Sequence, residues 1–429
     1  MEIEQLGEWN PWWENKTLVR DLAGKDRPDY KHLLESVTIR EITIITGVRR
    51  SGKSTIMYQM INSLIEKGID PMQILFVNFD DKKLSNSGLD DIYESYRASL
   101  NPNKKAYIFL DEIHKKDGWE SWIRKKYDLR SNDKFIISGS CSYLLKKEYS
   151  SLLTGRNLTF EVFPLSFHEF LLFNDVLVDT KNIAKGILLE KTKINIIHAL
   201  KQFLEFGGFP EIVLKAEAFK FLVLKQYFDD ILYKDVIDRY NLNSQKTKDL
   251  ALFLITNFTH LISLRNLRNS LGIAYDSIKD YLSHFKETFL FFTVEHFSYS
   301  LKEQKTLPSK VYCIDNGLRN AVSFKFSEDE GKLAENLVFL ELRRKHKDIY
   351  YWTSEKHEEV DFLIKHDSNA MTAINVSYTD EVPEREVRAL LQCRTTFKKV
   401  NDLVILTKDT EKKEGEVRFI PLWKWLLTN

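Results

Sequence analysis

The sequence predicts an α/β fold for the first part of the chain, because three of its features are typical of a parallel sheet covered by helices. Five short runs rich in β-branched and aromatic residues lie between residues 41 and 163. The runs are continuously apolar, as expected of strands that are buried on both faces. Helix-length segments such as Ser54–Lys67 and Gly118–Asp128 separate them. The expected strands are Glu41–Thr46, Gln73–Phe79, Ala106–Asp111, Lys134–Gly139 and Leu158–Phe163.

The hydrophobic pattern divides the 429 residues into four expected modules. Apolar side chains recur at spacings of three and four in Ile194–Phe206 and Phe219–Ile237, which predicts a helical connector after the α/β part. Further helices and a β-rich run follow, and then a mixture of helix and strand beyond an expected linker, Ser323–Glu330. The expected modules are residues 1–175 with an aromatic leader, 176–245, 246–322 and 323–429.

Composition excludes several classes of protein. Hydrophobic residues make up 43% of the chain and charged residues 29%, so there is enough apolar surface for packed cores, which excludes disorder along most of the length. Only 9 Pro and 16 Gly occur, which excludes collagen-like and low-complexity architecture. The 63 basic and 62 acidic residues nearly cancel, so any site for nucleic acid has to be a local patch.

The cysteines and the apolar segments indicate a cytoplasmic protein. Cys141, Cys313 and Cys393 are far apart and match no paired zinc or disulfide spacing, so we expect a reducing compartment and no structural metal. No uncharged apolar stretch approaches the roughly 18 residues of a membrane helix. The sequence begins with two acids in four residues, where a signal peptide would be basic. We therefore expect no membrane partner.

A phosphate-binding motif follows the first expected strand. Gly47–Ser54 matches G-x-x-x-x-G-K-[ST] at every position and leads directly into a helix. Such a loop directs backbone N–H groups at phosphate oxygens, while Lys53 reaches the β and γ phosphates and Ser54 can ligate Mg²⁺. The loop fits ATP and GTP alike, and we expect ATP and Mg²⁺ as cofactors. The expected nucleotide-binding residues of the loop are Gly47, Arg49, Arg50, Ser51, Gly52, Lys53, Ser54 and Thr55.

Acids at the end of a second strand complete the expected site. Asp111 ends the run Tyr107–Asp111 and would hold Mg²⁺, and Glu112 is placed to polarise an attacking water. An Asp-Glu pair in isolation is more often a solvated strand end. Ser138 or Ser140, at the end of the next strand, is a candidate sensor of the γ-phosphate.

An arginine follows a glycine turn at Thr154-Gly155-Arg156. Arg156 could reach a nucleotide in its own subunit or in a neighbouring one and stabilise the charge of the transition state. On spacing alone, an arginine that faces solvent or pairs with an acid is an equally open alternative.

These motifs, in this order, resemble a prokaryotic AAA+-type ATPase family, and the leader Asn10–Trp13 is similar to its archaeal branch. The resemblance implies a P-loop ATPase domain, a winged helix and a restriction-endonuclease-like C-terminal domain. It also implies a site formed by Lys53, Ser54, Asp111 and Glu112, with Arg156 at the family's conserved arginine. The matching segments are Gly47–Ser54, Leu110–Glu112, Ser138–Ser140, Thr154–Arg156, Phe163–Phe170 and Gly207–Pro210.

Residues Ser263–Leu282 predict a helix, a tight turn at Gly272 and a second helix, with Phe289–Phe297 as the expected wing. If this helix-turn-helix binds DNA, its second helix faces the major groove and the first contacts phosphates. The second helix has one lysine against two acids, so a packing or oligomerisation module is an equally open alternative. The expected contact residues are Tyr275, Asp276, Ser277, Lys279, Arg265 and Arg268.

The last module resembles the PD-(D/E)XK nuclease core but lacks two of its site residues. Glu335 lies on an expected helix and Asp361 on an expected strand. The next strand should carry an acid and a lysine two residues apart, and it has Asn375 and Ser377 instead. Without that metal ligand and that cation we predict no nuclease activity, and we interpret Glu335 and Asp361 as remnants on a platform for docking or for contact with nucleic acid.

Together these patterns predict an ATPase that couples Mg²⁺-dependent ATP hydrolysis to rearrangement of the winged-helix and nuclease-like modules. DNA, another protein and further copies of the chain are candidate partners. The alternative is a nucleotide-gated switch, in regulation or defence, that binds DNA or protein and hydrolyses ATP slowly.

Overall fold

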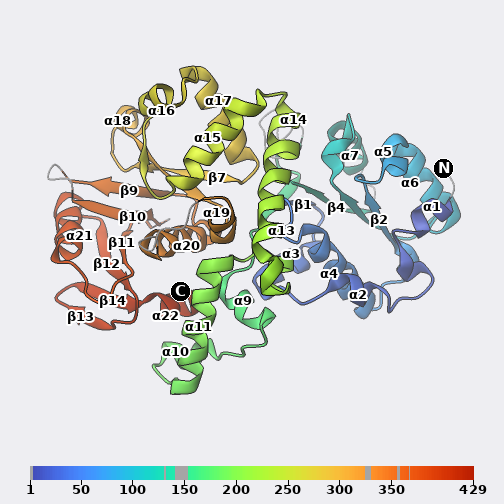
Figure 1. Ribbon diagram of the computed structural model, residues 1–429. Helices are drawn as coiled ribbons and strands as arrows, with labels where there is room; N and C mark the ends of the chain where they lie inside the picture. Colours follow the sequence, from blue (N-terminus) through green and yellow to red (C-terminus); the bar gives the residue numbers. More distant parts are fainter. Residues whose placement is uncertain (1–2, 130–131, 141–152, 324–329, 355–357, 367) are drawn as a thin grey trace. The chain divides into compact units, whose positions relative to one another are not determined.

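The computed structural model describes residues 3–129, 132–140, 153–323, 330–354, 358–366 and 368–429 (Figure 1). The chain divides into two compact units, Met1–Phe163 and Pro164–Asn429. The first unit therefore ends ahead of the boundary expected at residue 175, and the finer division into four modules stays a prediction. In the described part of the chain, no helix is both long and apolar enough to cross a bilayer.

The first unit is built on a five-stranded parallel sheet in the order β2-β3-β4-β1-β5. All five strands predicted from the sequence are confirmed, and their ends move by three residues or fewer. The strands are β1 (Ile42–Thr46), β2 (Ile74–Asn78), β3 (Tyr107–Asp111), β4 (Lys134–Gly139) and β5 (Asn157–Glu161). Because the strands are parallel, the residues that follow β1, β3 and β4 meet at one edge of the sheet.

Both faces of this sheet are buried, which explains the continuously apolar runs. Ile44 packs into one hydrophobic cluster and Ile45 into another. Neighbouring residues of β3 divide in the same way, because successive side chains of a strand point to opposite faces. The longest helices of the unit are α4 (Lys53–Glu66), α6 (Leu89–Ser99) and α7 (Trp119–Asp128), and shorter ones are α1 (Ile3–Gly7), α2 (Val19–Ala23), α3 (Lys31–Glu35) and α5 (Lys82–Asn86).

The aromatic leader covers the edge strand β2. The side chain of Asn10 donates to the carbonyl oxygen of Phe76 at 2.8 Å and accepts from its N–H at 2.7 Å, as a neighbouring strand would. Trp13 donates its indole N–H to the carbonyl oxygen of Ile74 at 2.9 Å, and Trp12 is buried behind it. The leader thus protects a sheet edge that would otherwise expose unpaired backbone groups.

Helices open the second unit. A Ser166–Glu169 capping box starts the first of them, α9. These helices are α9 (Phe167–Phe173), α10 (Thr180–Ala184), α11 (Glu190–Phe206), α12 (Pro210–Val213), α13 (Glu217–Asp230), the π-helical turn Ile231–Ile237 and α14 (Asp238–Tyr240). They agree with the helical connector expected from the apolar spacing.

The predicted helix-turn-helix is present as α16 (Leu264–Leu271) and α17 (Tyr275–Glu287), preceded by α15 (Ser244–Thr256). Gly272 has a φ of +65°, the left-handed conformation expected of the residue that ends the first helix. Leu267 and Ile278 are buried between the helices.

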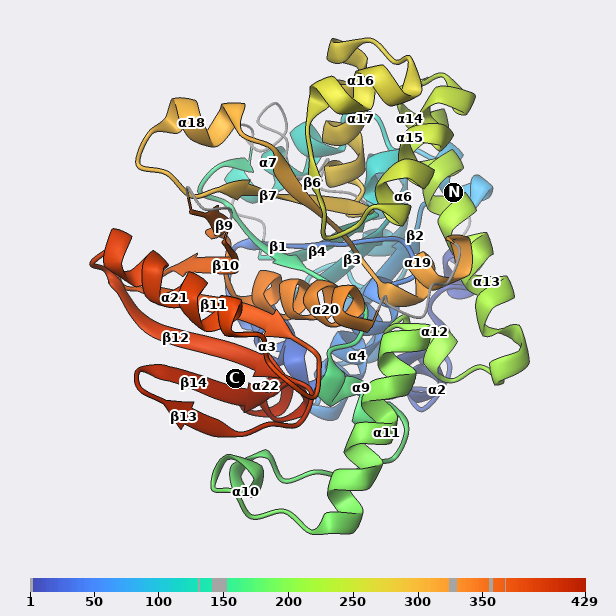
Figure 2. The same ribbon diagram turned by 60° about the vertical axis from the view of Figure 1, so that its left-hand side comes forward.

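Strands of the helix-turn-helix segment and of the C-terminal segment form one nine-stranded sheet (Figure 2). Its order is β13-β14-β12-β11-β10-β9-β7-β8-β6, and β7 pairs in parallel with β9. The strands are β6 (Leu261–Ile262), β7 (Phe291–His296), β8 (Ser309–Cys313), β9 (Ile349–Thr353), β10 (Glu359–Lys365), β11 (Met371–Ser377), β12 (Val400–Thr407), β13 (Lys412–Glu414) and β14 (Val417–Pro421). The helices among them are α18 (Leu301–Thr306), α19 (Asn316–Val322), α20 (Glu330–Lys345), α21 (Glu384–Thr396) and α22 (Leu422–Thr428).

The expected wing at Phe289–Phe297 corresponds to β7 in this sheet, and a winged helix stays a prediction. β7 lies between β8 and β9, and four of its six residues are buried. Burial on both sides stabilises a run that is rich in aromatic residues. Most of the expected linker, residues 324–329, lies outside the described residues.

Candidate functional site

The loop between β1 and α4 needs glycine at its first position. A Cβ on Gly47 would lie 2.1 Å from the carbonyl oxygen of Val162, which follows β5. Gly52, directly before α4, has a φ of +95°, a conformation that favours glycine. The motif glycines are therefore explained by a close approach and by a left-handed turn. Arg49 and Thr55 are half-buried, and Arg50 is exposed with a φ of +71°.

Inside this loop, polar groups are buried and directed at the backbone. Lys53 is 4% exposed, and its ammonium group donates to the carbonyl oxygens of Gly47 and Val48, both at 3.1 Å. Ser51 Oγ is buried and has no hydrogen-bond partner among the described residues. A buried cation beside an unsatisfied hydroxyl, in a loop at a helix N-terminus, fits phosphate oxygens.

Asp111 brings three elements together at the same sheet edge. Ser54 Oγ, on the first turn of α4, donates to Asp111 Oδ2 at 2.6 Å. Ser138 of β4 donates its hydroxyl proton to Asp111 Oδ1. Burial raises the pKa of the Asp111 carboxyl to about 6, and the charge of Glu112 adds to this. Carboxylate and hydroxyl oxygens are the ligands that Mg²⁺ prefers, so Ser54 and Asp111 fit this ion.

Glu112 has a strained backbone and a carboxylate that neighbouring groups hold in place. Its φ is +52°, a left-handed conformation that is unusual for a residue other than glycine. The N–H of Ser140 donates to Glu112 Oε2 at 3.1 Å, and His114 Nδ1 lies 3.2 Å from the same oxygen. The N–H of Glu112 donates to Ser138 Oγ at 3.1 Å.

The two serines that were candidate sensors therefore contact the acid pair. Ser138 uses its hydroxyl proton on Asp111 and its oxygen on the Glu112 N–H, and it is fully buried. This follows from the strand order, which places β4 between β1 and β3. A role of Ser138 at the γ-phosphate stays a prediction.

Two residues of this site carry no motif and were missed from the sequence. His114 lies on the turn after β3, and its only signal was its position two residues after Glu112. Arg27, between α2 and α3, is buried and donates to the carbonyl oxygens of Ser51 at 2.7 Å and Phe163 at 3.1 Å. Arg27 thus links the phosphate loop to the last residue of the first unit. No local sequence pattern indicated this contact.

Arg156 lies at the end of the sheet where β1 begins, whereas the phosphate loop lies at the end where β1 stops. Its carbonyl oxygen accepts from the N–H of Ile42 at the beginning of β1, whereas the loop follows Thr46 at the other end. Four residue steps separate these positions, roughly 13 Å along the strands. The side chain pairs with Asp128, with Nε 2.8 Å from Oδ1. A role of Arg156 at a nucleotide, in its own subunit or in a neighbouring one, stays a prediction.

In the second unit, a groove runs between the helix-turn-helix and the β7–β8 connection. Its volume is about 470 Å³, and the basic side chains that line it outnumber the single acid, Glu295. Burial lowers the pKa of Lys286, against the effect of Glu295. Of the predicted DNA contacts, Arg265, Tyr275 and Lys279 line this groove, whereas Arg268, Asp276 and Ser277 do not. The basic residues are Arg265, Lys279, Lys286 and Lys305.

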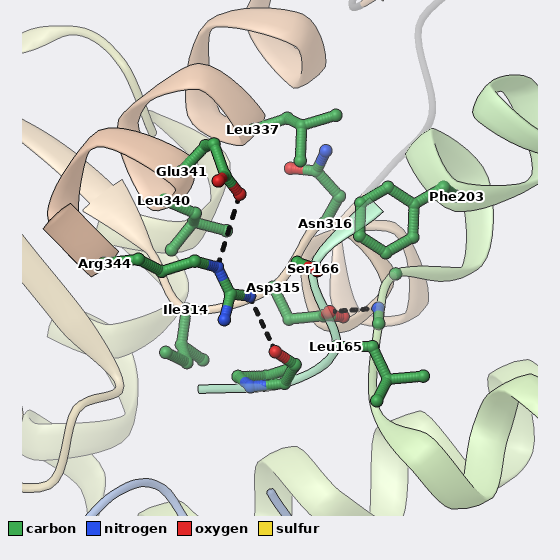
Figure 3. A pocket seen from close by; sticks show the side chains of 13 residues that line it. Leu165, Ser166, Phe203, Ile314, Asp315, Asn316, Leu337, Leu340, Glu341 and Arg344 are labelled. Carbon is green, nitrogen blue, oxygen red and sulfur yellow. Dashed lines mark hydrogen bonds and ion pairs between the residues drawn. The ribbon is translucent and has the colours of Figure 1, made fainter. Parts of the chain in front are cut away.

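A buried acid explains the glycine turn Gly207-Gly208 (Figure 3). Asp315 accepts from the N–H groups of Gly208 at 2.7 Å and Leu318 at 3.1 Å, and so caps α19. A Cβ on Gly207 would lie 2.0 Å from the Asp315 carboxylate. Burial raises the pKa of Asp315 to about 7, although these N–H groups and Arg344 lower it. Arg344, of α20, donates to the carbonyl oxygen of Pro164 at 2.6 Å.

The predicted remnants of the C-terminal module also meet. Glu335, on α20, and Asp361, on β10, line one cavity of about 470 Å³. Asn375 accepts from the N–H of Asp361 at 3.1 Å, and the hydroxyl of Ser377 lies 3.2 Å from that of Thr379.

Comparisons with known proteins agree with the site in the first unit. An AAA domain matches residues 39–171, and two domains of unknown function, DUF8612 and DUF4143, match residues 197–329 and 330–425. The chain is 35% identical over 408 residues to the uncharacterized protein MJ1544 of Methanocaldococcus jannaschii, which covers 90% of this chain and 88% of that protein. It is 28% identical over 398 residues to an uncharacterized protein of Haemophilus influenzae, covering 90% and 94%.

Solved structures align more distantly. AMPPCP-bound DnaA from Aquifex aeolicus aligns with a TM-score of 0.27 and 12% identity, over 60% of this chain and 85% of that one. A likeness at this level says nothing further about the activity of the chain.

Proposed function

This chain carries an AAA domain and belongs to the same family as the uncharacterized protein MJ1544, and we propose that it binds ATP with Mg²⁺ and hydrolyses it. The observation that carries this proposal is the bond between Ser54 and Asp111, which joins the phosphate loop to the acid strand. Glu112, one residue further, is held beside this bond by the Ser140 N–H and close to His114.

Each residue of the site then has a chemical role. The loop amides and the Lys53 ammonium would hold the phosphate groups, and Lys53 would exchange its two carbonyl acceptors for phosphate oxygens. Ser54 and Asp111 would hold Mg²⁺, which neutralises phosphate charge when bound. Glu112 would accept the proton of the attacking water, oriented by the Ser140 N–H and by His114.

Nucleotide binding and phosphate release by the purified chain test this proposal. Lys53→Ala is expected to abolish binding, because the buried ammonium cannot be replaced. Glu112→Gln should bind ATP as the wild type does but turn over at least ~100-fold more slowly. Lys67→Ala, an exposed lysine just after the same helix, is the matched control. Wild-type protein with no affinity for ATP, with or without Mg²⁺, would contradict the proposal.

A second candidate function is the binding of nucleic-acid phosphates by the second unit. The basic groove supports it, since four cationic side chains against one acid line a single cavity between α17 and the β7–β8 connection. Residues 246–322 would then be a winged helix whose strand β7 has joined the larger sheet. ATP hydrolysis would rearrange this module and the C-terminal one.

The alternative is a nucleotide-gated switch with slow hydrolysis. Turnover stimulated by DNA would favour the remodelling ATPase, whereas release of a bound partner on nucleotide exchange would favour the switch. No nuclease activity is proposed, since Asn375 and Ser377 occupy the positions of the acid and the lysine that this chemistry needs.

A further inference from the structure

A lysine that no sequence motif indicated lies among the acids of the C-terminal segment. Lys310, on β8, has its ammonium nitrogen 2.9 Å from Glu335 Oε1 and 2.9 Å from Asp361 Oδ1. It also forms an ion pair with Glu359. Its side chain is 2% exposed. One buried cation thus joins a strand of the helix-turn-helix segment to the helix and the strand that carry the acids.

Asp361 and Glu335 also accept hydrogen bonds from groups other than Lys310. Asp361 Oδ2 accepts from the N–H of Val376 at 2.9 Å, and Tyr312 donates its hydroxyl proton to Glu335 Oε1 at 2.8 Å. Asn375 donates its amide to Glu386 Oε2 at 2.7 Å. An acid in place of Asn375 would lose this bond and repel Glu386. Asn375, which stands where a nuclease would have an acidic metal ligand, is therefore complementary to its neighbour Glu386.

The charges agree with this geometry. Burial by itself would lower the pKa of Lys310, but Asp361, Glu335, Tyr312 and Glu359 together raise it well above its usual value. The ammonium group therefore stays charged. Burial raises the pKa of Glu335 to about 7, although Lys310 opposes this rise. A buried lysine stays charged only when acidic groups pair with it, since burial of an unpaired charge costs several kcal/mol.

An ammonium group in this position competes with a divalent metal ion. A metal bound by the same oxygens would lie about 2.0–2.6 Å from each of them, and so in contact with the Lys310 nitrogen. Access from solvent is not the obstacle, because the acids line an open cavity of about 470 Å³. Among the described residues, no three or more His, Cys, Asp and Glu side chains are grouped so as to hold a metal ion.

We propose that Lys310 is the built-in cation of this acid cluster: its ammonium group takes the place of a divalent metal ion and fastens β8 to the C-terminal segment. The nuclease-like site is thereby reused as an internal ion-pair latch. This explains why Glu335 and Asp361 remain in a chain that has Asn375 and Ser377 at the other two site positions.

Binding of Mn²⁺, followed by electron paramagnetic resonance without nucleotide, tests the latch. The wild type is expected to have no Mn²⁺ site that depends on Asp361. Lys310→Met should gain one such site per chain, and Lys310→Met with Asp361→Asn should lose it again. Lys302→Met, an exposed lysine on α18, is the matched control and should behave as the wild type does.

Thermal unfolding provides a second readout. Lys310→Met should lower the unfolding temperature by roughly 10 °C, because three partly buried acids lose their cation. Mn²⁺ should restore part of this loss in Lys310→Met and have no such effect on the wild type. Asp361→Asn should destabilise the Lys310→Met chain less than it destabilises the wild type, because the two residues act as one unit.

Two results would overturn the proposal. One is an Asp361-dependent Mn²⁺ site in the wild type, and the other is a Lys310→Met chain that gains no site and unfolds at the wild-type temperature. If Lys310→Met does not fold, the wild type and Lys310→Arg decide the question. A site in either contradicts the latch, and the absence of a site in both supports it.

Discussion

Ser54 Oγ and Asp111 Oδ2 lie 2.6 Å apart and join the first turn of α4 to the last residue of β3. The two residues are 57 positions apart in the chain, and only the parallel sheet brings them together. Asp111 is 1% exposed, so its negative charge is shielded from water. A bound cation would compensate this charge.

Asp111→Asn should remove the effect of Mg²⁺ on nucleotide affinity and slow turnover at least ~100-fold, because the carboxylate that would hold the ion is gone. It should not destabilise the chain at pH 8. The folded-state pKa of Asp111 is raised from 3.8 to about 6, so the charged acid costs stability as pH rises through this range, by at most about 3 kcal/mol. Nucleotide affinity with and without Mg²⁺, together with urea unfolding, checks both points. Ser63→Ala on the same helix is the control.

His114 should act on turnover through Glu112. Removal of the imidazole in His114→Ala leaves the carboxylate less well oriented, so kcat should fall about 10-fold while KM changes little. His114→Gln keeps a hydrogen-bonding group near Glu112 and should restore most of kcat. Steady-state kinetics of both variants, with His32→Ala as an exposed control, measure this. Equal values of kcat in the wild type and in His114→Ala would remove His114 from the mechanism.

Arg156 and Asp128 form a partly exposed ion pair, so breaking it from either side should leave the unfolding temperature close to that of the wild type. If Arg156 acts on a neighbouring subunit, Arg156→Ala should lose turnover and Asp128→Asn should keep it. A mixture of Arg156→Ala and Lys53→Ala chains should then regain activity, since each supplies the group that the other lacks. Unchanged turnover in Arg156→Ala would leave only the structural role.

The basic groove should bind duplex DNA in a salt-dependent manner. Lys279→Glu with Lys305→Glu is expected to weaken binding at least ~10-fold and to reduce the slope of affinity against salt, because phosphate contacts are lost. Arg268→Glu changes a charge on the same helix-turn-helix outside the groove and should have a smaller effect. Fluorescence anisotropy of a labelled duplex measures both. Absence of binding by the wild type at about 50 mM salt would eliminate this function.

Stability of the second unit should fall as pH rises from about 4 to about 7. The pKa of Asp315 is 3.8 in an unfolded chain and is raised to about 7 on folding, chiefly by burial. The folded chain therefore binds more protons than the unfolded one in this window, and unfolding becomes easier as pH increases. Asp315→Asn should make this dependence less steep, and Glu335, whose pKa is also raised to about 7, accounts for part of the rest. Urea unfolding between pH 5 and pH 8 measures it, and Asp276→Asn, an exposed acid, should keep the wild-type slope.

Features that depend on neighbouring residues were predictable from the sequence. The loop Gly47–Ser54, the acid pair Asp111-Glu112 and the helix-turn-helix around Gly272 are patterns within fewer than 25 residues. The strands were predictable for the same reason, because burial on both faces requires an unbroken apolar run. The residues within such an element determine it, whatever tertiary contacts the rest of the chain makes.

Only the tertiary structure decided which distant residues meet. The strand order brings Ser138 into contact with Asp111 and places Arg156 at the end of the sheet away from the phosphate loop. The spacing of residues along the chain does not indicate that order. Lys310 is 25 residues from Glu335 and 51 from Asp361, and it reaches them only because β7 pairs with both β8 and β9. By itself, the sequence determined the phosphate loop, the acid strand and the helix-turn-helix. The roles of Arg27, His114, Arg156 and Lys310 depend on strand pairing over long range, since a register is chosen by the burial of whole faces and not by any single residue.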